Sequence, residues 1–116
     1  MTNHFSVYQV KSGETAIYPG AGNSDSIEGL TYVALGLAGE AGEIANKAKK
    51  ILRDSNGVIS DDARMILADE LGDVLWYVSQ LANQLDYGLA YIATKNLAKL
   101  KGRKERGVLQ GSGDNR

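Results

Sequence analysis

Two pairs of acidic residues in this sequence share one spacing. Glu40 and Glu43 are three residues apart, and so are Glu70 and Asp73. On an α-helix, this spacing places both side chains of a pair on the same face. If two such helices lie antiparallel, four carboxylates converge, and their mutual repulsion requires cations nearby. The spacing therefore predicts a cation site between two helices.

The available ligand types narrow the identity of that cation. Carboxylate oxygens are hard ligands that favour Mg²⁺ or Mn²⁺ over zinc. The chain has no cysteine, and its single histidine, His4, is near the N-terminus, where a solvated residue is more typical than a metal ligand. A di-iron bundle would need Glu-x-x-His motifs, which are missing. An acidic magnesium centre suits phosphoryl chemistry, because divalent ions neutralise phosphate oxygens and lower the pKa of bound water.

The segments that carry these acids also contain glycines. Gly36, Gly39 and Gly42 interleave with the first pair, and Gly72 lies inside the second. A glycine in a helix interior costs about 1 kcal/mol relative to alanine. Either tight packing of another helix or close approach of a ligand would explain them. One E-x-x-E pair alone is most often exposed charge, so the prediction of a site depends on the two pairs together.

Basic residues suited to hold phosphates occur in two places. Lys47 continues the face of Glu40 and Glu43 one turn later. A second group clusters near the end of the last expected helix and consists of Lys95, Lys99, Lys101, Arg103, Lys104 and Arg106. Compensation of the helix dipole explains this second group as well as phosphate binding does, so both interpretations stay open.

The spacing of apolar residues predicts four helices to position these side chains. They are expected at about residues 5–15, 27–53, 61–85 and 89–101. Asp25 with Glu28 resembles an N-cap with its reciprocal acid, and Ser60 provides the next N-cap. Residues 54–57 (DSNG) form a stop signal. The predicted fold class is all-α, an antiparallel bundle of about four helices.

Composition excludes several other classes of function. The 13 basic and 14 acidic residues give a net charge of −1. The chain therefore has no excess of basic residues that would favour bulk binding to nucleic acid or membranes. No apolar run approaches the ~20 residues that a membrane span needs, and the N-terminus lacks the features of a signal peptide. Without cysteine, disulfides and thiol catalysis are excluded. We therefore expect a soluble cytoplasmic protein without nucleic-acid or membrane partners.

Two segments resemble the motifs of the MazG-like nucleoside triphosphate pyrophosphohydrolases. Residues 36–47 (GLAGEAGEIANK) are similar to the first motif, and residues 69–77 (DELGDVLWY) are similar to the second. The family signature is E-x-x-E, a spacer and then E-x-x-D, and the spacer between Glu43 and Glu70 is 26 residues long. The resemblance spans nearly the whole chain, because it extends to residues 18–19, 96–100 and 106–116.

This resemblance implies an all-α fold in which Glu40, Glu43, Glu70 and Asp73 hold Mg²⁺, with Mn²⁺ as a substitute. It implies hydrolysis of a nucleoside or deoxynucleoside triphosphate to the monophosphate and pyrophosphate, through attack of a metal-activated water on the α-phosphate. The first-motif glutamates Glu43 and Glu40 are the candidate catalytic residues. Of the two, Glu43 is expected to orient or deprotonate the water.

The resemblance also implies contacts to the substrate. Candidates for the triphosphate are Lys47, Asn96, Lys99 and Arg103. Trp76 and Tyr77 follow the second motif and are candidates to stack on the base, although a core role suits Trp76 equally well. Residues of the first helix, Phe5, Tyr8 and Gln9, are expected to line the other side of a base pocket.

Residues 1–102 are expected to form the pyrophosphohydrolase domain, and residues 103–116 a polar C-terminal tail. Family members assemble as dimers or tetramers, with sites sometimes completed across subunits. A homodimer or homotetramer is therefore implied, and a small bundle gains core by that step. Two alternatives stay open: a phosphoribosyl-ATP pyrophosphohydrolase, and a non-catalytic helical module for nucleotide sensing or oligomerisation. The complete set of four acids argues against the non-catalytic module.

Overall fold

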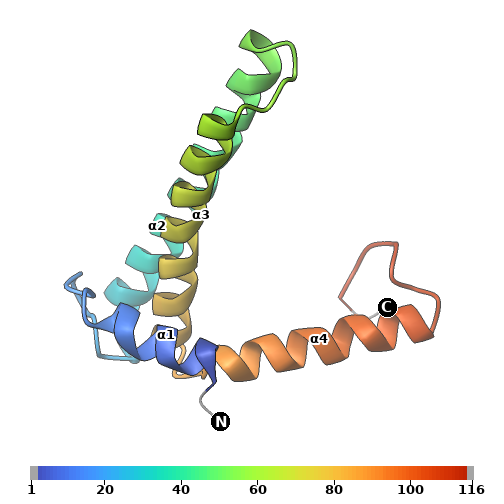
Figure 1. Cartoon of the computed structure of the whole chain (residues 1–116). Helices are drawn as coiled ribbons and strands as arrows, with labels where there is room; N and C mark the ends of the chain where they lie inside the picture. Colours follow the sequence, from blue (N-terminus) through green and yellow to red (C-terminus); the bar gives the residue numbers. More distant parts are fainter. Residues whose placement is uncertain (1–2, 115–116) are drawn as a thin grey trace.

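The computed structural model describes residues 3–114, which form four α-helices and no strand. The helices are α1 (His4–Gly13), α2 (Ile27–Asp54), α3 (Asp61–Gln84) and α4 (Leu89–Glu105). The all-helical class and the number of helices are thus confirmed. Helices α2 and α3 lie side by side and are joined at one end by residues 55–60, whereas α1 packs near their other end (Figure 1). Within residues 3–114, no helix has the long apolar stretch that crossing a bilayer requires.

Short polar side chains begin the first three helices. The side-chain oxygens of Asn3, Ser26 and Ser60 each accept a hydrogen bond from a backbone N–H two or three residues later, at 2.9 to 3.1 Å. These bonds satisfy N–H groups that have no partner inside the helix. The N-cap predicted at Ser60 is confirmed. The N-cap predicted at Asp25 was wrong by one residue, because the hydroxyl of Ser26 takes that position.

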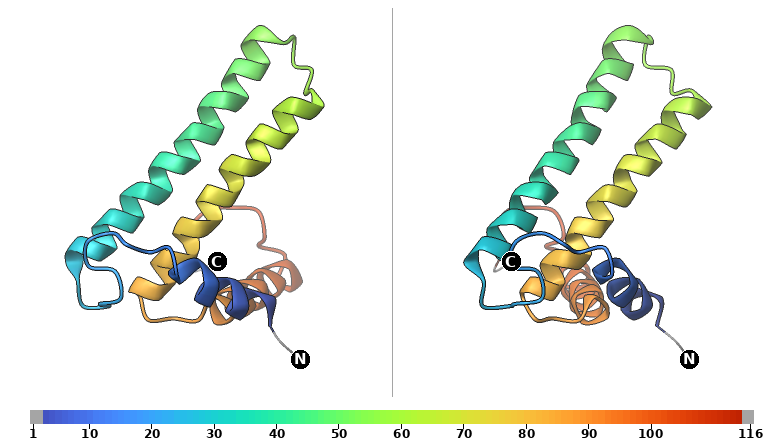
Figure 2. Two further views of the ribbon diagram at one scale, coloured as in Figure 1. Left: turned by 60° about the vertical axis from the view of Figure 1, so that its left-hand side comes forward. Right: turned by 90° about the vertical axis from the view of Figure 1, so that its left-hand side faces the viewer.

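The turn between α2 and α3 follows the predicted stop signal. Helix α2 ends at Asp54, and the next residues include Asn56 at φ 51° and Gly57 at φ 75°. A left-handed backbone is readily adopted by glycine and tolerated by asparagine. The sequence at this point therefore reverses the chain and brings α3 back along α2 (Figure 2).

Gln9 of α1 provides a hydrogen-bond acceptor for the first turn of α4. Gly88 precedes α4 and has no side chain to cap it. Gln9 Oε1 accepts a hydrogen bond from the backbone N–H of Leu89 at 2.8 Å, while Gln9 Nε2 donates to Asn83 Oδ1 and to the carbonyl of Tyr87, both at 2.9 Å. Both ends of the Gln9 amide are thus engaged within the fold rather than directed at a base.

Helix α4 extends away from the α2–α3 pair (Figure 1). Among the described residues, it packs against α1 and α3 but not against α2. It ends at Glu105, four residues beyond the predicted end, so the first residues assigned to the tail belong to its last turn. Residues 1–2 and 115–116 lie outside the described residues. The division at residue 102 and the closed antiparallel bundle stay predictions.

The core of the single chain is small and partly polar. The buried hydrophobic residues in the described range are Tyr18, Val33, Ala82 and Leu89. Between α1 and α3, the hydroxyls of Ser12 and Ser79 are 2.7 Å apart, and Gln80 Nε2 donates to Ser12 Oγ at 2.9 Å. Buried hydrogen bonds therefore help to fix α1 to α3 near Ser79 and Gln80.

Candidate metal centre

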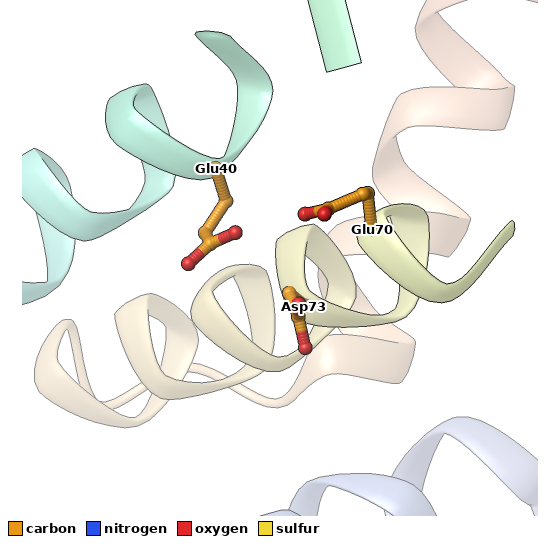
Figure 3. A group of neighbouring side chains, drawn as sticks. All are labelled: Glu40, Glu70 and Asp73. Atoms are coloured by element: carbon orange, nitrogen blue, oxygen red, sulfur yellow. The ribbon is translucent and has the colours of Figure 1, made fainter. Parts of the chain in front are cut away.

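Three of the four predicted acids converge where α2 faces α3. Carboxylate oxygens of Glu40, Glu70 and Asp73 lie within 4.8 Å of one another (Figure 3). Glu40 belongs to α2, and the other two residues come from adjacent turns of α3, as their spacing predicts. Glu40 and Glu70 are half-buried and Asp73 is exposed, so the group is accessible from solvent. We call these three residues the acidic triad.

The repulsion within the acidic triad raises the pKa of Glu40. Its pKa is raised above the ordinary value, first by partial burial and then by the charges of Asp73, Glu70 and Glu43. A hydrogen bond with Glu70 raises the pKa further, since it needs a proton between the two carboxyl groups. A divalent cation would relieve the same repulsion. The donor set fits Mg²⁺ or Mn²⁺, because it consists of carboxylate oxygens.

Glu43 lies outside the acidic triad and is paired with a lysine. Lys47 Nζ is 3.8 Å from Glu43 Oε2 and 3.2 Å from Glu70 Oε1, so it joins the two helices. The Glu43 side chain is 57% exposed. The structure thus brings together three of the predicted metal ligands and places Lys47 beside them. The roles of Glu43 as a fourth ligand and as a catalytic residue stay predictions.

Tyr77 lies against the backbone of α2, one turn beyond Asp73. A Cβ added at Gly36 would overlap the Tyr77 ring, so the glycine is required for this contact. The pKa of Tyr77 is raised first by burial, then by neighbouring Tyr32 and by the charges of Glu40 and Asp73. Tyr32 was missed at the sequence level. Its position, eight residues before Glu40, places it on the same face of α2 and was the available signal.

The other glycines near the acids face open space. Nothing lies within 4 Å of a Cβ built at Gly39, Gly42 or Gly72. The predicted close approach is therefore confirmed at Gly36 and is not met at these three positions within one chain.

Trp76 joins the end of α1 to α3. Its Nε1 donates to the carbonyl of Ser12 at 3.1 Å and to Thr15 Oγ1 at 2.9 Å. Its ring meets those of Tyr18 and Tyr77 in edge-to-face contacts, with centroids 6.4 and 5.0 Å away. These contacts support the packing role that the sequence left open, and stacking of Trp76 on a base stays a prediction.

Tyr8 of α1 lies within electrostatic range of one acid of the triad, Asp73. Its pKa is raised first by burial and then by the negative charge of Asp73. Phenol groups from two helices, Tyr8 of α1 and Tyr77 of α3, therefore both interact with the charge of Asp73. The contribution of α1 to one side of a substrate pocket stays a prediction.

The remaining residues predicted to contact phosphate lie on α4, which leads away from the α2–α3 pair (Figure 1). Asn96 and Lys99 line a separate cavity of about 540 Å³, together with Lys95 and the stacked rings of Tyr87 and Tyr91. Arg103 is 5% exposed and donates to the carbonyl of Asp114 at 3.1 Å. A single chain therefore does not bring Asn96, Lys99 or Arg103 to the triad.

The raised pKa of Glu40 predicts a pH dependence of the metal-free protein. Between the ordinary pKa and the raised one, the folded chain holds more protons than the unfolded chain. The free energy of unfolding contributed by Glu40 therefore falls as the pH rises through this interval. Thermal unfolding in EDTA measures this effect when the wild type is compared with Glu40→Gln. The Tm of the wild type minus that of the variant should decrease with rising pH. A difference in Tm that stays constant with pH would argue against a raised pKa of Glu40.

The matches to known proteins include the part of the chain that carries the acidic triad. The family model described as the MazG nucleotide pyrophosphohydrolase domain matches residues 29–108. The acidic triad, Glu43 and Lys47 all lie inside this range. The chain is also similar to the "Gene 37 protein" of Mycobacterium phage L5, with 65% identity over 113 residues, or 97% of this chain and 99% of the relative. No solved structure gives a significant match.

Proposed function

This chain belongs to the MazG nucleotide pyrophosphohydrolase family, and we propose that it hydrolyses a nucleoside or deoxynucleoside triphosphate to the monophosphate and pyrophosphate. The observation that carries the proposal is the convergence of Glu40, Glu70 and Asp73 within 4.8 Å, inside the region that matches the family. Three carboxylates this close favour a cation. A triphosphate needs such a cation to offset its own charge.

The side chains around the acidic triad suggest how the reaction proceeds. The triad would hold Mg²⁺ or Mn²⁺ through its carboxylate oxygens, and such a cation neutralises phosphate oxygens and lowers the pKa of water. Glu43, one turn along α2 from Glu40, is proposed to orient a water molecule and accept its proton. The water oxygen forms a bond to the α-phosphorus. The bond from that phosphorus to the bridging oxygen breaks, and pyrophosphate leaves.

The substrate would lie across the solvent-exposed side of the triad. Lys47 is proposed to contact the triphosphate, because its ammonium group already lies beside Glu70. Tyr77 is proposed to contact the sugar or the base, since its ring lies one turn beyond Asp73. The predicted contacts from α4 would have to come from a neighbouring subunit; these are Asn96, Lys99 and Arg103.

We also propose that the chain acts as a homodimer or homotetramer. Its radius of gyration is 17.1 Å, which exceeds the value of about 13 Å for a compact chain of this length. Large apolar side chains on α2 and α3 are exposed; these include Leu35, Met65, Ile66, Leu71 and Leu75. A second copy that covers them would enlarge the small core of the single chain.

Sedimentation equilibrium should therefore give the mass of two or four chains. Leu71→Glu places a charge on an apolar surface where the wild-type side chain is 59% exposed, and it should lower the mass toward one chain. Ile17→Glu is the matched control, because Ile17 lies in a loop and is 94% exposed. It should leave the mass unchanged. A wild-type protein that sediments as one chain would refute the assembly.

Hydrolysis in ¹⁸O-labelled water tests the position of attack. Attack on the α-phosphate places the label in the nucleoside monophosphate and leaves the pyrophosphate unlabelled. Label in the pyrophosphate would contradict the proposal, and so would release of inorganic phosphate as the first product. Phosphoribosyl-ATP is assayed beside the nucleotides, and turnover of this compound alone would favour the related pyrophosphohydrolase instead.

A further inference from the structure

We propose that Lys47 is the resident counter-ion of the metal centre: its ammonium group neutralises Glu70 in the metal-free protein and is displaced when a divalent cation binds. This inference depends on the proposed function, because it assumes that the acidic triad holds the cation. It assigns to Lys47 a positioning role that precedes any contact with substrate.

The position of the ammonium group is the first argument. Lys47 Nζ is 3.2 Å from Glu70 Oε1, and Glu70 belongs to the acidic triad. The Glu70 side chain is 21% exposed and that of Lys47 is 34% exposed, so the pair is partly shielded from solvent. Lys47 also lies 3.8 Å from Glu43, the acid outside the triad. One ammonium group thus joins an acid of α2 to an acid of α3.

Repulsion between two cations that share the Glu70 carboxylate is the second argument. Mg²⁺ binds carboxylate oxygens at about 2.0–2.1 Å. A cation held by the Glu70 carboxylate would therefore lie close to the ammonium group, and the two positive charges would repel each other. This repulsion would drive Lys47 away from Glu70 when the cation binds. Removing the charge of Lys47 should then strengthen metal binding.

The side chain of lysine suits such an exchange. Its four-carbon stem is flexible and its ammonium group is a compact charge with no fixed orientation. After displacement, the ammonium group stays tethered to α2 beside the triad, where the negative charge of a triphosphate would arrive. Lys47 thus stabilises the acids before the metal binds and is available to the phosphates afterwards. A lysine that only stabilises the α2–α3 pair would not oppose metal binding.

Metal binding without nucleotide tests the inference. The full chain is titrated with Mn²⁺, and free Mn²⁺ is measured by electron paramagnetic resonance. Lys47→Met removes the charge and keeps most of the side-chain volume, whereas Lys47→Arg keeps the charge. Lys49→Met is the matched control, because Lys49 is an exposed residue of the same helix without an ion pair to the acids among the described residues. Circular dichroism verifies that each variant is folded.

Lys47→Met should bind Mn²⁺ about tenfold more tightly than the wild type, as expected for removing one positive charge near a divalent ion. Lys47→Arg and Lys49→Met should stay within about twofold of the wild type on the same grounds. Unchanged or weaker binding by Lys47→Met would overturn the counter-ion role while leaving the metal site intact. No Mn²⁺ binding by the wild type would overturn the metal site and, with it, this inference.

Discussion

Replacing Glu40 by glutamine should lower the rate of pyrophosphate release by about two to three orders of magnitude. Glu40 is the one member of the acidic triad that α2 provides, and its oxygens face those of Glu70 and Asp73 (Figure 3). Glutamine keeps the shape of the side chain but removes the charge, so the cation loses a ligand and the phosphates lose the charge that it brings. The turnover number at saturating Mg²⁺ measures the effect.

Two further variants separate the role of Glu40 from those of other acids on the same helix. Glu28→Gln removes an exposed acid of the same helix and should change turnover by less than about twofold, as surface charges distant from a site do. Glu43→Gln should lose turnover but retain Mn²⁺ binding if Glu43 acts on the water, whereas Glu40→Gln should lose both. Turnover by Glu40→Gln close to that of the wild type would refute the assignment of the triad.

Gly36→Ala should destabilise the protein by about 1–3 kcal/mol, although alanine is the better helix former. The added methyl group would overlap the ring of Tyr77, which lies on the backbone of α2 at this point. To make room, the ring must shift or the two helices must separate. The acids of α2 and α3 would then move apart, so KM for the substrate should also rise. Urea denaturation monitored by circular dichroism gives the change in the free energy of unfolding.

Gly39→Ala is the matched control for Gly36→Ala. Nothing lies within 4 Å of a Cβ at Gly39, so alanine there should stabilise the single chain by up to about 1 kcal/mol through helix propensity. Equal stability of the two variants would show that the contact of Gly36 with Tyr77 is unimportant. Destabilisation by Gly39→Ala would indicate that another subunit or a ligand approaches Gly39 in solution.

The elements that carry the site could be predicted because their signals are local. The i, i+3 spacing of Glu70 and Asp73 fixes their common face, and the hydroxyl of Ser60 begins the helix that carries them. These features depend on residues only a few positions apart. The stop after Asp54 is equally local, since Asn56 and Gly57 adopt a left-handed backbone.

Contacts that depend on side-chain choice could not be predicted in the same way. Lys47 and Glu40 share a helix face with Glu43, but the spacing does not decide whether Glu43 turns toward the triad or toward the lysine. That choice depends on competing charges from α3. The direction of α4 also depends on a distant residue, because the side chain that caps its first turn is Gln9, 80 residues earlier in the chain.

The measurement that tests the central claim most directly is release of pyrophosphate from a panel of nucleoside and deoxynucleoside triphosphates, with Mg²⁺ and with EDTA. We expect release from one or a few nucleotides in Mg²⁺, and none from any of them in EDTA or with Glu40→Gln. Release that is equal in Mg²⁺ and EDTA would contradict the metal centre. If none of the nucleotides releases pyrophosphate in Mg²⁺, the proposed hydrolysis of these nucleotides is contradicted.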